Sequence, residues 1–250
     1  SPKKRHNSRA HYTDHLSAKE VNRGLLDGTL FKGQLRINAF DRNEAYVTAP
    51  DVPSEHDVYI YGENARNRAL DGDIVIIALN PEKQWRKRDK LQQQQQQGGG
   101  GDNSSALQPT GKVVAIAEKL RKENIVGVLK PARDTDSSEE STTGGGMINS
   151  GVVVDQQFVY FVPVDRRYPR IMIPTAQCPL AFIRNPVQWQ KELFVASIVK
   201  WTASSALPMG QLKQHVGKSG QFETEINCLL IQSGLQYQDI DDVTVNNNNN

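Results

Sequence analysis

The fold of this chain is decided by a short stretch near its start, FKGQLRIN, which occupies residues 31–38. Small and apolar residues alternate there with polar ones: Phe31, Gly33, Leu35 and Ile37 against Lys32, Gln34, Arg36 and Asn38. A period of two is typical of a β-strand that buries one face. The stretch therefore predicts a half-buried strand whose outer face is cationic.

Four further strands are expected around this one from the same alternation and from the turn residues between them. They are predicted at residues 44–50, 57–61, 74–79 and 111–116. A capping box from Ser17 to Glu20 predicts a short helix before the first strand, and Gly28 ends it. Five short strands with one long insertion favour a small barrel over an open sheet, because closure removes exposed edges.

A second series of strand patterns follows, at residues 125–129, 158–164, 171–174, 193–201 and 210–216. Four apolar residues after it share one face of a predicted helix: Phe222, Ile226, Leu229 and Leu230. We expect this helix to pack on the barrels or on a domain that follows. The predicted fold class is therefore all-β, with two tandem five-stranded OB-type barrels, short flanking helices and low-complexity loops.

The length of 250 residues suits two domains once the Gln, Gly and Asn tracts are set aside. Such polar repeats cannot bury enough apolar surface to form a core. The predicted divisions are a basic tail at 1–11, a first domain at 12–119 with an insertion at 84–108, a second domain at 122–217, and a helix with a polar linker at 218–250. Within the insertion, residues 85–107 are predicted to be disordered.

Little in the sequence points to catalysis, metal binding or a membrane. The formal net charge is +2, and the two cysteines, Cys178 and Cys228, fit no paired zinc-ligand spacing. His11 and His15 have no third ligand beside them, and no apolar run is long enough to span a membrane. We therefore expect an intracellular chain with no cofactor of its own and no membrane contact.

Strand phase gathers cations and aromatic rings on the outer face of the first barrel: Lys32, Arg36, Tyr46, Tyr59 and Tyr61. Bases stack on such rings for about 1–3 kcal/mol each, and Lys and Arg neutralise phosphates. The face therefore predicts binding of single-stranded nucleic acid. The alternative is that the tyrosines cover loops or meet a neighbouring domain.

Other basic residues are weaker candidates for the same binding. Arg66 and Arg68 follow the third strand and are predicted to form a corner that contacts phosphate, and the run WRKR at 85–88 offers an accessory contact. The second barrel repeats the theme with Lys130, Tyr160, Arg166, Arg167 and Arg170. Basic turns are also commonly solvated, and Asp165 stands beside two of these arginines as an alternative partner.

Four motifs carry a resemblance to a known family. They are GTLFKGQLRIN at 28–38, ARNRALDGDIV at 65–75, VDRRYPRIMIP at 164–174 and LFVASIVKW at 193–201. The first two resemble the first cold-shock domain of RNase II/RNB-family exoribonucleases, and the last two resemble the second. Within that family the chain is most similar to the Dis-three-like exonuclease two subfamily, over roughly residues 12–242.

The resemblance implies a 3′–5′ exoribonuclease that degrades uridine-tailed RNA in the cytoplasm without the exosome. It also implies a magnesium-dependent nuclease domain beyond this chain, in the same polypeptide, so the chain itself is expected to bind and guide single-stranded RNA without cleaving it. Relatives with an inactive nuclease domain act as mRNA-binding translational repressors, which is the second reading. A third is a protein-interaction module whose aromatic face meets a partner.

Overall fold

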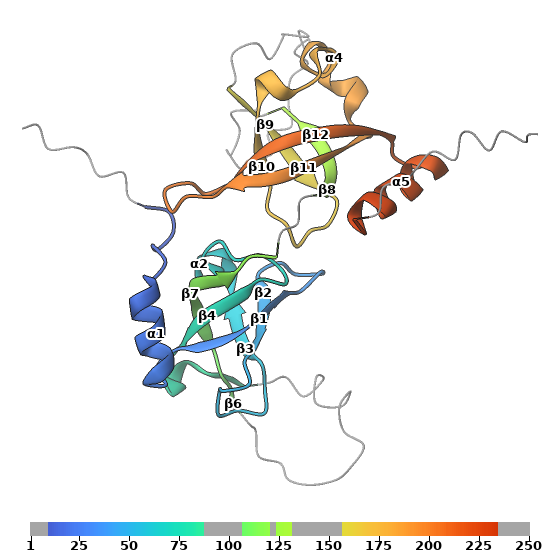
Figure 1. The fold of residues 1–250 in the computed structure, drawn as a ribbon. Coiled ribbons are helices and arrows are strands. Elements are labelled where there is room, and N and C mark those ends of the chain that lie inside the picture. Colours follow the sequence, from blue (N-terminus) through green and yellow to red (C-terminus); the bar gives the residue numbers. More distant parts are fainter. Residues whose placement is uncertain (1–9, 88–106, 121–123, 132–156, 235–250) are drawn as a thin grey trace, which may run out of the picture. The chain divides into compact units, whose positions relative to one another are not determined.

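A computed structural model of the chain describes residues 10–87, 107–120, 124–131 and 157–234 (Figure 1). The chain divides into two compact units. Unit 1 contains Ser1–Lys122 together with two later segments, Asp165–Ile171 and Ile198–Met209. Unit 2 contains the remainder: Glu123–Val164, Met172–Ser197 and Gly210–Asn250.

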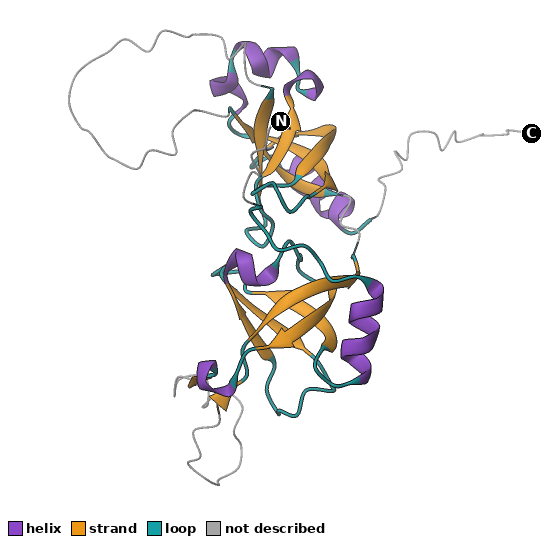
Figure 2. Ribbon diagram, turned by 90° about the vertical axis from the view of Figure 1, so that its left-hand side faces the viewer, coloured by secondary structure: helices purple, strands orange, loops and turns teal. Residues whose placement is uncertain are grey.

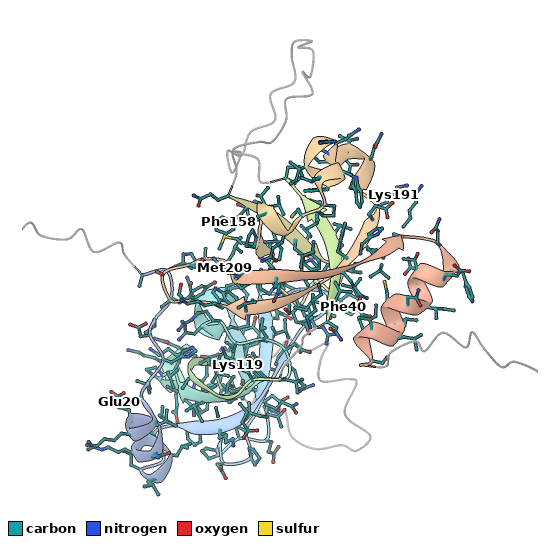
Figure 3. All side chains as sticks on the ribbon, turned by 45° about the horizontal axis from the view of Figure 1, so that its top comes forward. Glu20, Phe40, Lys119, Phe158, Lys191 and Met209 are labelled. Atoms are coloured by element: carbon teal, nitrogen blue, oxygen red, sulfur yellow. The ribbon has the colours of Figure 1, made fainter. Side chains whose placement is uncertain are left out.

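Helix α1, Ala18–Leu26, begins with the predicted capping box. The Glu20 backbone N–H donates to Ser17 Oγ at 3.4 Å, and the Ser17 N–H donates to the Glu20 carboxylate at 2.8 Å. These reciprocal bonds satisfy two donors that the start of a helix otherwise leaves free. Figure 3 shows Glu20 in the first turn of this helix.

The strands predicted for the first barrel all form, and they make one antiparallel sheet. In chain order they are β1 (Phe31–Ile37), β2 (Glu44–Thr48), β3 (Val58–Tyr61), β4 (Ile74–Leu79) and β7 (Gly111–Glu118). Their order in the sheet is β3-β2-β1-β4-β7. The edges approach each other at Tyr59, whose N–H donates to Pro109 O at 2.8 Å and which forms a bridge with Thr110. The sheet is therefore nearly closed into a barrel.

Burial in this sheet follows the predicted strand phase. The fully buried inner cluster includes Leu35, Val47, Val58, Ile60 and Val75. A second apolar layer lies outside β4 and β7 and joins them to α1, through Leu30, Ile76, Ala115 and Val21. Figure 2 shows α1 beside this sheet. The strand β4 is therefore covered on both faces, which explains its unbroken apolar sequence.

The turn before β4 is built by the motif ARNRALDGD at residues 65–73. Asp73 is 2% exposed, and its carboxylate accepts from Leu70 N–H at 2.9 Å and from Leu120 N–H at 3.0 Å. Gly72 has φ of +87°, a left-handed conformation that a glycine adopts without a steric penalty. The second half of the motif therefore serves the fold of the barrel.

Both ends of the insertion between β4 and β7 are ordered, so the prediction of disorder over 85–107 is wrong there. The 3₁₀ turn η1 (Glu82–Gln84) leads into β5 (Arg86–Lys87), which pairs antiparallel with β6 (Leu107–Gln108). Figure 2 shows this short ribbon beside η1. The remainder of that prediction, residues 88–106, lies outside the described part of the chain.

The second barrel is closed, with the order β10-β12-β11-β8-β9. Its strands are β8 (Ile125–Lys130), β9 (Phe158–Pro163), β10 (Ile171–Pro174), β11 (Glu192–Lys200) and β12 (Met209–Lys218). Each overlaps a predicted strand, so the fold class is confirmed. Three short helical turns, which the sequence analysis did not predict, join β10 to β11: η2 (Thr175–Gln177), α4 (Leu180–Arg184) and η3 (Pro186–Trp189).

The last helix, α5 (Phe222–Gln232), packs on the second barrel by a different face from the one predicted. Cys228 belongs to a buried cluster of that barrel, and Ile231 packs against it. Thr224 lies on the same side, and its hydroxyl occupies the space over Gly217. A Cβ on that glycine would lie only 2.5 Å from Thr224 Oγ1. The predicted apolar face is largely solvent-exposed, with Phe222 at 80% and Leu229 at 64%.

Three further properties concern the described residues. None of their helices is long and apolar enough to cross a membrane. Within the same ranges, no three His, Cys, Asp or Glu side chains gather as a group able to hold a metal ion. Cys178 and Cys228 are both buried free thiols, and burial raises the pKa of Cys178 to about 11.

Candidate nucleic-acid interface

The outer face of the first sheet places three of the predicted binding residues in one cross-strand row. Arg36 in β1 lies opposite Tyr46 in β2, which lies opposite Tyr59 in β3. In the next row, Tyr61 lies opposite Glu44. The ring centroids of Tyr46 and Tyr59 are 5.5 Å apart, and those of Tyr59 and Tyr61 are 6.0 Å apart. The sequence pattern therefore located a real cluster of rings with a guanidinium at its end.

The three rings differ in exposure, and this corrects the prediction for one of them. Tyr61 is 63% exposed and Tyr46 is half-buried, whereas Tyr59 is 8% exposed. The strand directs Tyr59 outward as predicted, but the Arg86 guanidinium lies over its ring, 4.0 Å from the centroid. Tyr59 is therefore not a free stacking surface in this structure.

Glu44 is the polar centre of this face. Its carboxylate accepts from Asn38 Nδ2 at 3.0 Å and from the hydroxyls of Tyr46 and Tyr59 at 3.4 Å each. It also lies 3.9 Å from the Arg86 guanidinium. Burial, and then the Glu44 charge, raise the pKa of Tyr59 to about 12. Glu44 could not be predicted from the sequence, because an acidic residue at a strand start carries no signal of such a role.

The two predicted cations of the same face each have a carboxylate partner. Lys32 Nζ lies 3.0 Å from Glu118, and Arg36 pairs with Asp57. The side chains of Lys32 and Arg36 are 48% and 60% exposed, so both remain accessible to a ligand. Exposed pairs of this kind contribute only about 0–1 kcal/mol, and a phosphate can compete for them.

The predicted phosphate-binding corner is only partly at the surface. It follows α2 (Gly62–Arg66) and turns through Asn67 and Arg68, both in the left-handed region. Arg66 is 7% exposed and donates to the backbone carbonyl of Arg42, so the prediction that it contacts phosphate at the surface is wrong. Burial lowers the pKa of its guanidinium. Arg68 is half-buried and donates to Thr13 O at 2.9 Å.

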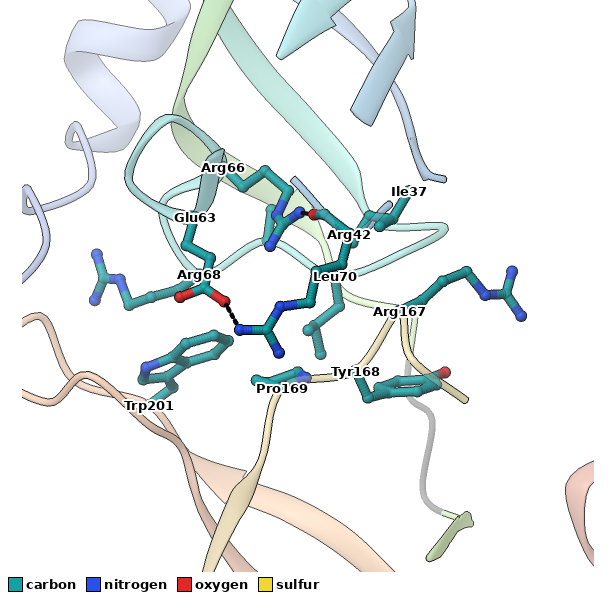
Figure 4. A pocket seen from close by; sticks show the side chains of 11 residues that line it. Ile37, Arg42, Glu63, Arg66, Arg68, Leu70, Arg167, Tyr168, Pro169 and Trp201 are labelled. Atoms are coloured by element: carbon teal, nitrogen blue, oxygen red, sulfur yellow. Dashed lines mark hydrogen bonds and ion pairs between the residues drawn. The ribbon is translucent and has the colours of Figure 1, made fainter. Parts of the chain in front are cut away.

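Arg66 lines a pocket within unit 1 (Figure 4). Arg42 and Glu63 point toward each other there, with 2.6 Å between Arg42 Nη2 and Glu63 Oε1. Pro169 and Trp201 line the other side. The guanidiniums of Arg68 and Arg167 point away from the centre of the pocket, in opposite directions. Arg68 and Arg167 therefore do not converge on one ligand position.

The remaining predicted residues lie in three kinds of surroundings. Arg167 Nη2 lies 2.7 Å from Asp165 and its Nη1 lies 2.8 Å from Asp71, so it takes the alternative role of an ion-paired turn residue. Arg166 and Arg170 are exposed. In the second barrel, exposed Lys130 lies directly opposite half-buried Tyr160 across β8 and β9. This pair is a smaller version of the face on the first barrel.

One exposed ring near the first face was missed by the sequence analysis. Phe40, in the loop between β1 and β2, is 95% exposed. Its backbone N–H donates to Asn38 Oδ1 at 2.9 Å, which orders the loop. The available signal was an aromatic residue between the strands predicted at 31–38 and 44–50, where nothing calls for an apolar side chain.

Two tandem OB barrels, of which the first carries an aromatic and cationic face, define a protein with paired cold-shock domains. Comparison with known proteins agrees. Residues 10–103 match the family model of the Rrp44-like cold shock domain, and residues 158–234 match that of Dis3-like cold-shock domain 2. Both barrels are therefore similar to the cold-shock domains of Dis3-like proteins, and the resemblance read from the motifs is confirmed.

Individual relatives come from several branches of that family. The chain is 28% identical to DIS3-like exonuclease 2 of Xenopus tropicalis, over 91% of the chain and 34% of the relative. It is also 28% identical to the exosome complex exonuclease RRP44 homolog A of Arabidopsis thaliana, over 90% and 24%. The structure of yeast Ssd1, a pseudonuclease, superimposes with a TM-score of 0.67 at 25% identity, over 90% of this chain and 28% of that one. The chain thus spans about a third or less of the length of these relatives.

Proposed function

We propose that this chain binds single-stranded RNA through the outer face of β1, β2 and β3. The observation that carries the proposal is the cross-strand row of Arg36, Tyr46 and Tyr59, with the exposed ring of Tyr61 beside it. An exposed ring offers a stacking surface to a base, and a nearby guanidinium suits the adjoining phosphate. Such a face suits single-stranded RNA, because the bases of a duplex are stacked on one another and cannot also stack on protein side chains.

We further propose that the chain is the RNA-binding part of a 3′–5′ exoribonuclease that acts on uridine-tailed RNA in the cytoplasm, independently of the exosome. The similarity of both barrels to Dis3-like cold-shock domains supports this. In such a protein the barrels guide the strand to a nuclease domain of the same polypeptide, where magnesium supplies the hydrolytic chemistry. The chain alone is expected to bind RNA and leave it intact.

A second candidate is an mRNA-binding repressor whose nuclease domain is inactive. It is favoured by the likeness to yeast Ssd1, a pseudonuclease, which extends over 90% of this chain. Both candidates give the described barrels the same task, binding single-stranded RNA. Incubating the full-length protein with RNA and magnesium distinguishes them, since release of mononucleotides requires an active nuclease.

RNA binding by the chain is tested by fluorescence anisotropy with a labelled oligo(U) of about 20 nucleotides, at salt concentrations of about 50 and 200 mM. The expected result is saturable binding that weakens as salt rises, with much weaker binding of a duplex of equal length. A gel of the same samples with magnesium should show intact RNA. Absence of binding at the lower salt concentration would contradict the proposed function and favour a protein-interaction module.

A further inference from the structure

We propose that the β5–β6 ribbon is an intramolecular competitor of RNA, because it holds the Arg86 guanidinium on the ring of Tyr59, where a base would otherwise stack. This inference rests on the proposed function, and it concerns how access to the aromatic row is controlled. The ribbon belongs to the insertion between β4 and β7, whose low-complexity sequence gave no reason to expect a defined contact.

The contact is specific in its geometry. Arg86 Cζ lies 4.0 Å from the centroid of the Tyr59 ring, within the range of a cation–π interaction. A guanidinium is planar and stacks on aromatic faces as a base does. Tyr59 and Tyr61 both point outward from β3, yet their exposed fractions are 8% and 63%. The ring that Arg86 covers is thus the one that is closed to solvent.

The charge pattern of the face supports a self-occupied state. Glu44, at 3.9 Å, lies close enough to attract the Arg86 guanidinium, and it accepts the Tyr59 hydroxyl at 3.4 Å. Carboxylates also pair with Lys32 and Arg36 on the same face. Each cation that RNA would use here is therefore satisfied by a partner within the chain, and binding becomes an exchange of partners.

The pairing within the ribbon itself is short, which favours such an exchange. Its ladder consists of two residue pairs, Arg86 with Gln108 and Lys87 with Leu107, and a two-stranded ribbon of that length has little stability of its own. Among the described residues, a side-chain hydrogen bond joins it to the residue just before β3, from Gln108 Nε2 to Asp57 O at 3.0 Å. Gln108 Oε1 is buried and has no partner among the described residues, which penalises the docked position.

The test compares three variants of the full chain. Arg86→Ala removes the cover, Arg86→Lys keeps the charge but loses the planar stack, and Lys87→Ala removes an exposed charge from the same ribbon as a matched control. Nitration of tyrosines by tetranitromethane, mapped by mass spectrometry, reports access to Tyr59. The exposed Tyr61 serves as the internal standard. Anisotropy with oligo(U) measures RNA binding.

The expected result is a several-fold rise in Tyr59 nitration in both Arg86 variants and none in Lys87→Ala. RNA binding should tighten by roughly 3- to 30-fold in Arg86→Ala, because RNA then no longer has to break the cation–π contact between Arg86 and Tyr59. This gain is expected even though the substitution removes a positive charge. A Tyr59 that stays protected in Arg86→Ala would contradict the cover.

The two proposals fail in different ways. Oligo(U) that binds the unmodified chain and binds Arg86→Ala no more tightly than Lys87→Ala contradicts the competitor alone. In that case Arg86 is either neutral or a direct RNA contact. Oligo(U) that binds none of the four proteins contradicts the proposed function and the competitor together. Arg86→Lys separates charge from stacking, since tighter binding there cannot arise from a change in charge.

Discussion

Replacing Tyr59 and Tyr61 separately by alanine should separate two effects that are usually mixed, loss of stability and loss of RNA binding. The two rings stack on each other with centroids 6.0 Å apart, and they come from the same strand. They differ in exposure, at 8% and 63%. Tyr59 also bonds to Glu44 through its hydroxyl and contacts Arg86 through its ring. We expect the first variant to lose mainly stability, because a base that stacks on Tyr59 must first displace Arg86, and the second to lose mainly affinity.

The magnitudes follow from burial. Removing a buried aromatic side chain costs about 3–5 kcal/mol, and the lower value is appropriate for Tyr59 because the space opens toward the surface. For a domain of this size each kcal/mol shifts the Tm by about 4–8 °C, so Tyr59→Ala should lower it by about 12–24 °C. Tyr61→Ala removes the contact between the two rings, which stabilises the fold by about 0.5–1.5 kcal/mol. It also removes a stacking surface of about 1–3 kcal/mol, which is about 5- to 150-fold in Kd.

Circular dichroism melts measure the first effect, and anisotropy with oligo(U) well below both transitions measures the second. Tyr61→Phe is the control, since it keeps the stacking ring and should bind RNA nearly as the unmodified chain does. Unchanged affinity in a well-folded Tyr61→Ala would refute the stacking role of this face. A Tyr59→Ala variant that melts at the normal temperature would refute the structural role of the covered ring.

Three further predictions follow from the same contacts. Lys32→Ala and Arg36→Ala should each reduce the slope of log affinity against log salt by about 0.7, and an unchanged slope in anisotropy titrations would mean that neither contacts phosphate. Deleting residues 92–101 should change the free energy of unfolding, measured from thermal melts, by no more than about 0.6 kcal/mol, the effect of a twofold change in loop length. A larger loss of stability would show that the tract packs against the barrel. The raised pKa of Tyr59, about 12, means that the folded chain keeps a proton which the unfolded chain loses near pH 10. Stability in urea should therefore fall as pH rises from about 10 to about 12, and Tyr59→Phe should reduce that fall.

The barrels could be predicted from the sequence because their information is local. Alternation in residues 31–38 set the phase of β1, and the observed burial of Leu35 and Ile37 follows it. Turn residues between the runs marked where each strand ends. Strand boundaries differ by at most a few residues from those predicted. Hydrogen bonding to a neighbour extends β7 and β12 beyond the predicted ranges, whereas β2, β3 and β9 are shorter than predicted.

The candidate site could be predicted only in part, because exposure depends on what covers a side chain. Strand phase gave the direction of the Tyr59 ring but not the presence of Arg86, which comes from beyond the next strand. The same limit applies to Arg66, whose burial depends on the carbonyl of Arg42. The packing face of α5 was mispredicted because the space over Gly217 selects Thr224, a contact that apolar periodicity does not record.

Unit 1 includes residues up to Met209 although its barrel is complete by residue 118, and this has a consequence for how the protein folds during synthesis. Tyr12 shows the dependence: its N–H donates to Ala203 O at 2.8 Å, its hydroxyl donates to Ala206 O at 3.1 Å, and its ring meets Trp201 edge-on. A ribosome that has released the first barrel needs roughly 4–17 s more to supply those partners. During that interval the side chain of Tyr12, 4% exposed in the finished unit, lacks its cover. The nascent first unit is thus open to proteases and chaperones around Tyr12, and a truncation before residue 198 would keep it in that condition permanently.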